Sequence, residues 1–169
     1  MTTNLKEKED YFFNPTEYLI KKITMKANRA IIEYSNDDEF KTNECKFKVK
    51  DDITENFKIL WNEVKEIIIA LTPALYKEAQ ALKINAISFN YDHGYLNDVS
   101  IVAVWTIDDN GHILNLNYNN YPIYREEFAE DVVAISGKHI DLLLDILSSA
   151  KKYMNGETIT LEGGMGLRP

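Results

Sequence analysis

Two groups of three short strand-like segments, each followed by an amphipathic helical stretch, constrain the fold of this chain more than any other feature. The clearest strand pattern is Glu44–Lys50, where three apolar residues alternate with charged ones. A period of two is typical of an antiparallel strand with one solvated face, and outward lysines suit a sheet edge. Two further strands are expected before it, at Leu19–Lys26 and Arg29–Ser35.

A second group of strands is predicted at Ile84–Tyr91, Val99–Ile107 and His112–Tyr118. The middle segment is apolar on both faces, which indicates a strand in the interior of a sheet. Asp108–Gly111 ends in Asn-Gly, a strong signal for a tight hairpin turn. The polar stretch Asp92–Asp98 is expected to be a loop.

Helical spacing of apolar residues follows each strand group. The first stripe begins after Asp52, which is placed to cap a helix, and ends before Pro73, which has no backbone N–H. Thr72-Pro73 could equally cap a second helical piece at Ala74–Leu82. The second begins after Ser136 and runs to Met154, where Asn155-Gly156 predicts a C-cap.

The predicted fold class is therefore α+β: an antiparallel sheet of about six strands with two long helices on one face, in the order βββαβββα. The 169 residues suit one domain. We expect an N-terminal arm at 1–18, a single domain at 19–156 and a flexible C-terminal tail at 157–169. One face of the sheet would be open, which favours a homo-oligomer.

No motif in the sequence points to catalysis. The histidines His93, His112 and His139 have no metal-ligand spacing, and Cys45 lies in the apolar phase of its strand. Nucleophile elbows and phosphate-binding loops are missing. We therefore expect no catalytic residues, no metal and no cofactor. The single cysteine favours a reducing cytoplasm, and no apolar run is long enough for a membrane span.

The charge balance is acidic: 19 basic and 27 acidic residues give a net charge of −8. Direct binding to nucleic acid or to an anionic membrane is therefore not expected. The acidic residues form clusters, which either belong to a solvated surface or meet a basic partner. The candidates for such an acidic surface are Asp37, Asp38, Glu39, Glu126, Glu127, Glu130 and Asp131.

Tyrosine and asparagine are concentrated in and around the second strand group. Tyrosine combines a large apolar ring with a polar tip, which suits recognition surfaces as well as half-buried sheet positions. If these residues form a binding surface, its members are Tyr91, His93, Tyr95, Asn115, Asn117, Tyr118, Tyr121, Tyr124 and Arg125.

Four segments of the chain resemble a group of small phage and prophage α+β proteins. They are Ile23–Lys26, Ile31–Tyr34, Ile84–Phe89 and Tyr153–Gly156, and the resemblance covers roughly residues 19–156. It implies a mobile-element origin and a protein that acts in the cytoplasm of an infected host cell. Small acidic proteins of this kind are often inhibitors or sequestering agents directed at host machinery.

The leading hypothesis is a non-enzymatic binding protein that inhibits a host defence protein, for example a nuclease, through an acidic and tyrosine-rich surface. One alternative is a protein that sequesters a nucleotide signal on Tyr91, Tyr95 or Tyr118. Another is an accessory factor in phage DNA metabolism, with lysines of the third strand facing DNA. Cations available to an anionic nucleotide are Arg29, Arg125, Lys138 and Lys152, and the lysines facing DNA are Lys46, Lys48 and Lys50.

Overall fold

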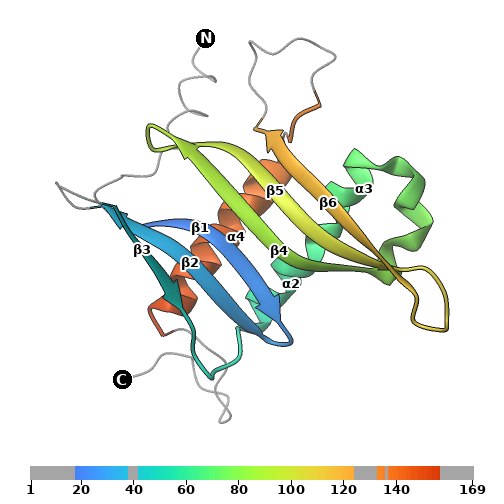
Figure 1. The fold of residues 1–169 in the computed structure, drawn as a ribbon, viewed down its shortest axis with the longest axis horizontal. Coiled ribbons are helices and arrows are strands. Elements are labelled where there is room, and N and C mark those ends of the chain that lie inside the picture. The colour runs from blue at the N-terminus through green and yellow to red at the C-terminus, as the bar shows by residue number, and fades with distance from the viewer. Residues whose placement is uncertain (1–17, 38–41, 124–132, 136, 157–169) are drawn as a thin grey trace.

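A computed structural model of the chain describes residues 18–37, 42–123, 133–135 and 137–156. These residues form six strands, three α-helices and one 3₁₀-helix (Figure 1). The elements, in chain order, are β1 (Tyr18–Lys26), β2 (Arg29–Asp37), β3 (Thr42–Phe47), α2 (Glu55–Glu63), α3 (Lys65–Leu71), η1 (Pro73–Ala81), β4 (Leu82–Asp92), β5 (Tyr95–Thr106), β6 (Ile113–Pro122) and α4 (Lys138–Met154).

The strands form one antiparallel sheet in the order β3-β2-β1-β4-β5-β6. It consists of two three-stranded meanders that meet where β1 pairs with β4. This junction has three register pairs, Lys22 with Ser88, Ile23 with Ile87 and Thr24 with Ala86. The predicted antiparallel six-stranded sheet and the α+β class are confirmed. The charged strand β3 lies at an edge, and β5 lies between two neighbours, as their sequence patterns indicate.

Helices α2 and α4 pack behind the sheet and leave its other face open, and α3 extends past the β6 side in this view, as Figure 1 shows. The core lies between these layers, and alternate strand residues point into it, such as Ile23, Ile32 and Ile87, all fully buried. The helices contribute the opposing side with Phe57, Trp61, Val64, Ile67, Ile68, Ile140, Leu143, Ile146, Leu147, Ala150 and Tyr153.

The first helical region differs from the prediction of one long helix. It is divided into α2 and α3 at Val64. The 3₁₀-helix Pro73–Ala81 lies where a second helical piece after Thr72-Pro73 was the alternative. The predicted cap Asp52 is also wrong: Thr54 is the N-cap, and its hydroxyl accepts the Phe57 N–H at 3.2 Å. A side chain at the N-cap satisfies one of the free donors of the first turn, which is why Thr54 fixes the start.

The ends of the last helix are a second difference. Its N-cap is Gly137, which makes no side-chain capping bond, and the predicted cap Ser136 lies outside the described residues. The predicted C-cap is confirmed, since Asn155 ends the helix and Gly156 has a positive φ of 99°.

The segment predicted as a loop at Asp92–Asp98 is mostly strand. Only His93 and Gly94 form the turn, with φ values of 50° and 84°. Positive φ at both central residues matches the twist of a two-residue hairpin, so Tyr95 already pairs with Asp92. Strand β6 likewise continues beyond Tyr118 to Pro122.

Candidate functional site

The open face of β4, β5 and β6 carries a cluster of uncharged side chains that we call the neutral patch. Sheet register brings its members together: Ser88 pairs with Ser100, Val102 with Asn117 and Val104 with Asn115. The two asparagines are exposed, and the serines and valines are half-buried. The neutral patch is thus defined as Ser88, Ser100, Val102, Val104, Asn115 and Asn117.

The other half of the open face is charged. Lys22, Glu33 and Lys46 occupy neighbouring positions on β1, β2 and β3, and Lys22 adjoins the neutral patch by pairing with Ser88. Opposite charges at such cross-strand positions attract each other, so this half resembles an ordinary solvated sheet surface. The open face therefore combines a charged half with one in which charged side chains flank the patch, Lys83 beside Val104 and Asp98 near the hairpin end.

A hydrogen-bonded network holds one end of the neutral patch. Asn119 and Asn120 form a bulge opposite Ser100, and Asn120 has a positive φ of 56°. The Asn120 N–H donates to Ser100 Oγ at 2.9 Å, and Ser100 Oγ donates to Asn120 Oδ1 at 3.3 Å. Asn90 Nδ2 donates to Asp98 Oδ1 at 2.6 Å. The sequence interpretation missed this network, although asparagine is among the residues that tolerate such a conformation.

The candidate residues of β6 lie on opposite faces of the sheet. Asn115 and Asn117 are on the open face, whereas Tyr118 and Tyr121 lie on the helix side, with ring centroids 5.9 Å apart. Tyr118 is only 8% exposed, and its hydroxyl is 2.7 Å from Thr72 Oγ1. A strand alternates its side chains between two faces, so these tyrosines and asparagines do not share one surface.

Tyr91 bridges the two halves of the sheet. Its hydroxyl donates to the Ile20 carbonyl at 2.7 Å, and the Lys21 ammonium lies 5.3 Å from its ring centroid. Burial raises the pKa of Tyr91 well above its usual value near 10. The ring therefore ties β4 to β1 beside their short junction.

We expect Tyr91 to make the fold sensitive to alkali. A tyrosine whose pKa is raised by folding stabilises the folded state below its unfolded pKa, about 10, and this contribution is lost as pH rises further. Thermal melts from neutral to strongly alkaline pH should therefore show a shallower alkaline decline for Tyr91→Phe than for the wild type. Tyr76→Phe removes an exposed hydroxyl and should follow the wild type. Identical alkaline profiles for Tyr91→Phe and the wild type would show that Tyr91 plays no such role.

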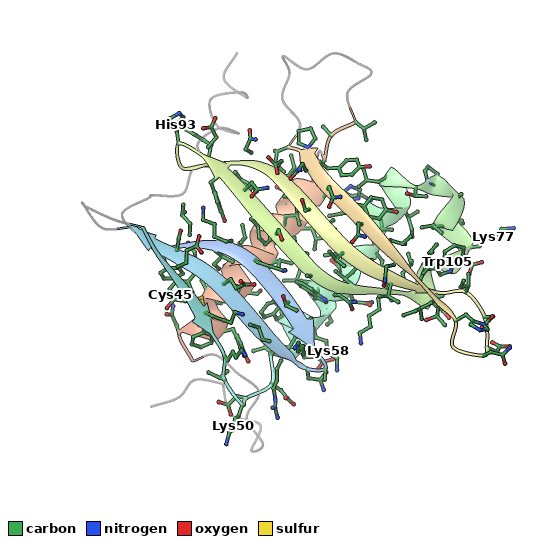
Figure 2. The ribbon with its side chains drawn as sticks, in the orientation of Figure 1. Cys45, Lys50, Lys58, Lys77, His93 and Trp105 are labelled. Atoms are coloured by element: carbon green, nitrogen blue, oxygen red, sulfur yellow. The ribbon has the colours of Figure 1, made fainter. Side chains whose placement is uncertain are left out.

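His93 and Tyr95 lie at the tip of the β4–β5 hairpin, where Figure 2 labels His93. His93 is exposed, and its Nε2 lies 3.5 Å from Asp92 Oδ1. Tyr95 is 38% exposed. Both are accessible to a partner at this tip, away from the helix layer.

Several candidate residues lie wholly or partly outside the described structure. Asp37 ends strand β2, and only its backbone is described. The others, for which no position is described, are Asp38, Glu39, Tyr124, Arg125, Glu126, Glu127, Glu130 and Asp131.

The part of the chain that the structure describes offers few groups for metal or thiol chemistry. Within it, no three histidine, cysteine or acidic side chains gather as a metal site. Cys45 is half-buried on edge strand β3 (Figure 2). None of the described helices has the length and apolar character to cross a bilayer.

The fold and this surface define an α+β protein with one open sheet face. No protein-family model, curated protein or solved structure matches the chain.

Proposed function

We propose that this is a non-enzymatic binding protein that inhibits a host protein in the cytoplasm of an infected cell, and that the neutral patch is its contact surface. The observation that carries the proposal is an uncharged, partly apolar cluster on an open sheet face of a chain whose net charge is −8. The buried centre of a protein–protein interface is depleted of charged residues, whereas its rim is polar.

The geometry supports recognition by surface fit. The patch lies on three paired strands, so its side chains are positioned before a partner arrives, which lowers the entropic cost of binding. Lys22, Lys83 and Asp98 flank it and provide a charged rim. Val102 and Val104 supply apolar area near its centre.

A host defence protein, such as a nuclease, is the partner class that we propose, because of the resemblance to phage and prophage proteins. The acidic clusters at 37–39 and 126–131 would then steer a basic partner toward the patch. Steering makes the association rate fall as salt rises, whereas dissociation from an uncharged contact depends little on salt. Phosphate mimicry would instead make the whole affinity fall steeply.

Nucleotide sequestration receives less support from the described residues. Tyr118 is only 8% exposed, and the Lys21 ammonium lies over the Tyr91 ring, so a base could stack on either ring only by displacing neighbouring side chains. The exposed lysines Lys46 and Lys48 keep the DNA alternative as a separate hypothesis, which a gel shift at low salt tests directly.

The proposal predicts that Ser88→Arg abolishes partner binding. Ser88 lies on the open face between Lys22 and Ser100, so an arginine there introduces a charge and bulk at the border of the patch, where the partner must approach. Ser148→Arg is the matched control, because Ser148 is exposed on α4 behind the sheet. Pull-down from host lysate with quantitative mass spectrometry should show a loss of about tenfold or more in the captured protein for Ser88→Arg alone.

Thermal melts of both variants confirm that they are folded. Equal capture by Ser88→Arg, Ser148→Arg and the wild type would contradict the proposed contact surface.

A further inference from the structure

The two edges of the sheet differ in charge. Edge strand β3 has six residues and exposes Glu44 and Lys46, with Lys48 directly after it. Charged side chains at an edge discourage pairing with another strand. Edge strand β6 has ten residues, ILNLNYNNYP, and none of them is charged. Only β6 therefore lacks the usual charged protection.

Apolar side chains are exposed along the first half of β6. Ile113 is 56% exposed and Leu114 is 47% exposed, and Ile107, just before the hairpin turn, is 50% exposed. Two chains of charge −8 repel each other, and an uncharged strand is where they can approach without opposing like charges. This points to a second copy of the chain as a partner that the edge can accept.

The length of the available edge is limited by the other end of β6. The bulge at Asn119 and Asn120 interrupts the regular backbone, and Pro122 has no N–H to donate. The Pro122 carbonyl already accepts the Ile135 N–H at 2.8 Å. Regular strand is therefore available from Ile113 to Tyr118, where β5 is the only neighbouring strand among the described residues.

Two copies of this stretch can pair antiparallel across a twofold axis with compatible side chains opposite each other. An antiparallel partner must keep each face of the sheet continuous, so residues on the same face must lie opposite each other. With the axis at Asn115, Leu114 of one copy faces Leu116 of the second copy on the helix side. Asn115 faces Asn115, and Ile113 faces Asn117, on the open side. Placing the axis at Leu116 instead would set Leu114 opposite Tyr118, which is already buried and bonded to Thr72.

We propose that two copies of this chain pair edge to edge through β6, antiparallel across a twofold axis at Asn115. The two six-stranded sheets then form one continuous sheet. The open faces join as well, so the two neutral patches become one surface that spans both copies. The pairing does not depend on the proposed binding function, and its test requires no partner protein.

Disulfide trapping tests the register. Directly opposite residues in an antiparallel pair have Cα atoms about 4.5–5.5 Å apart, within the range that a disulfide spans. In a Cys45→Ala background, Asn115→Cys should form a disulfide-linked dimer under mild oxidation. Asn117→Cys is the control: its Cα atoms would lie about 14 Å apart, so it should stay unlinked alone but link to Ile113→Cys in a mixture.

Light scattering on the unmodified chain provides the second measurement. It should show twice the mass of one chain, and Leu114→Glu, which opposes like charges near the axis, should raise the dimer Kd about tenfold or more. Ile59→Glu, at an exposed position on α2, should leave the dimer unchanged. A monomeric unmodified chain, or a dimer that persists in Leu114→Glu without an Asn115→Cys crosslink, would overturn the proposal.

Discussion

Trp61→Ala should lower the free energy of unfolding by about 3–5 kcal/mol, the usual cost of truncating a large buried side chain. Trp61 is 6% exposed in the core between α2 and the sheet. Its indole N–H also donates to the Ile84 carbonyl at 2.9 Å, which ties α2 to β4. Trp61→Phe retains most of the buried area but leaves that carbonyl unpaired, so we expect a loss of about 1–3 kcal/mol. Urea denaturation followed by circular dichroism measures the free energy of unfolding of both variants.

Trp105 is a matched control for this hydrogen bond. It lies at the far end of β5 (Figure 2), and its buried indole nitrogen has no hydrogen-bond partner among the described residues. Removing an unsatisfied buried donor does not break a bond, so Trp105→Phe should leave stability unchanged or slightly increased. Equal losses for Trp61→Phe and Trp105→Phe would show that the bond to Ile84 does not stabilise the fold.

Tyr153→Ala should have an effect of similar size, again about 3–5 kcal/mol. Tyr153 is 1% exposed, and its ring meets Phe47 of β3 and Phe57 of α2 edge to face, at centroid distances of 5.9 and 6.2 Å. Its hydroxyl donates to the Asp51 carbonyl at 2.7 Å. One side chain of α4 thus connects the edge strand, the first helix and the segment between them.

The contributions of the ring and the hydroxyl can be separated. Tyr153→Phe keeps the ring contacts and loses the hydrogen bond, so it should cost about 1–2 kcal/mol. Tyr76→Ala changes an exposed ring on η1 and should stay within about 0.5 kcal/mol of the wild type. If Tyr153→Ala cost no more than Tyr76→Ala, the aromatic cluster would not stabilise this end of the molecule.

The strands could be predicted because local alternation reports directly on which side chains meet the core. In Glu44–Lys50 the predicted outward residue Lys46 is exposed, and Phe47 packs against the core. A hairpin joins β5 to β6 at Asp108–Gly111 as predicted, but the Ile107 N–H to His112 carbonyl bond closes a four-residue loop in which only Gly111 has a positive φ, of 83°. Both signals depend only on residues close together in sequence.

The helix ends and the β4–β5 hairpin were harder to predict, because local patterns do not show where a helix breaks or where a turn begins. Apolar spacing continues through Val64, because α2 and α3 both bury residues on the side that faces the sheet, so the pattern does not reveal the break. At the β4–β5 turn, polar residues such as Asn97 and Asp98 suggested a loop. In the structure these two side chains bond to each other, Asn97 Nδ2 to Asp98 Oδ2 at 2.9 Å, inside strand β5 where its register against β4 shifts by one residue.

The candidate site also combines features that the local sequence indicates with features that depend on contacts between strands. Composition drew attention to the tyrosines and asparagines of the second strand group, including Asn115 and Asn117. The contribution of Ser88 and Ser100 required the register of β4 against β5, and the Asn120 network required the bulge. Neither register nor bulge has a local signature in these residues.

The amino-acid sequence by itself determined where most strands lie, which of their faces are apolar, and that helices must cover one side of an antiparallel sheet. The tertiary structure alone decided that β1 lies beside β4 and that β6 is left at an edge, which creates both the neutral patch and the free strand. The physical reason is that periodicity records how each segment divides its residues between core and solvent. The choice of neighbouring strand depends instead on contacts between segments far apart in the chain.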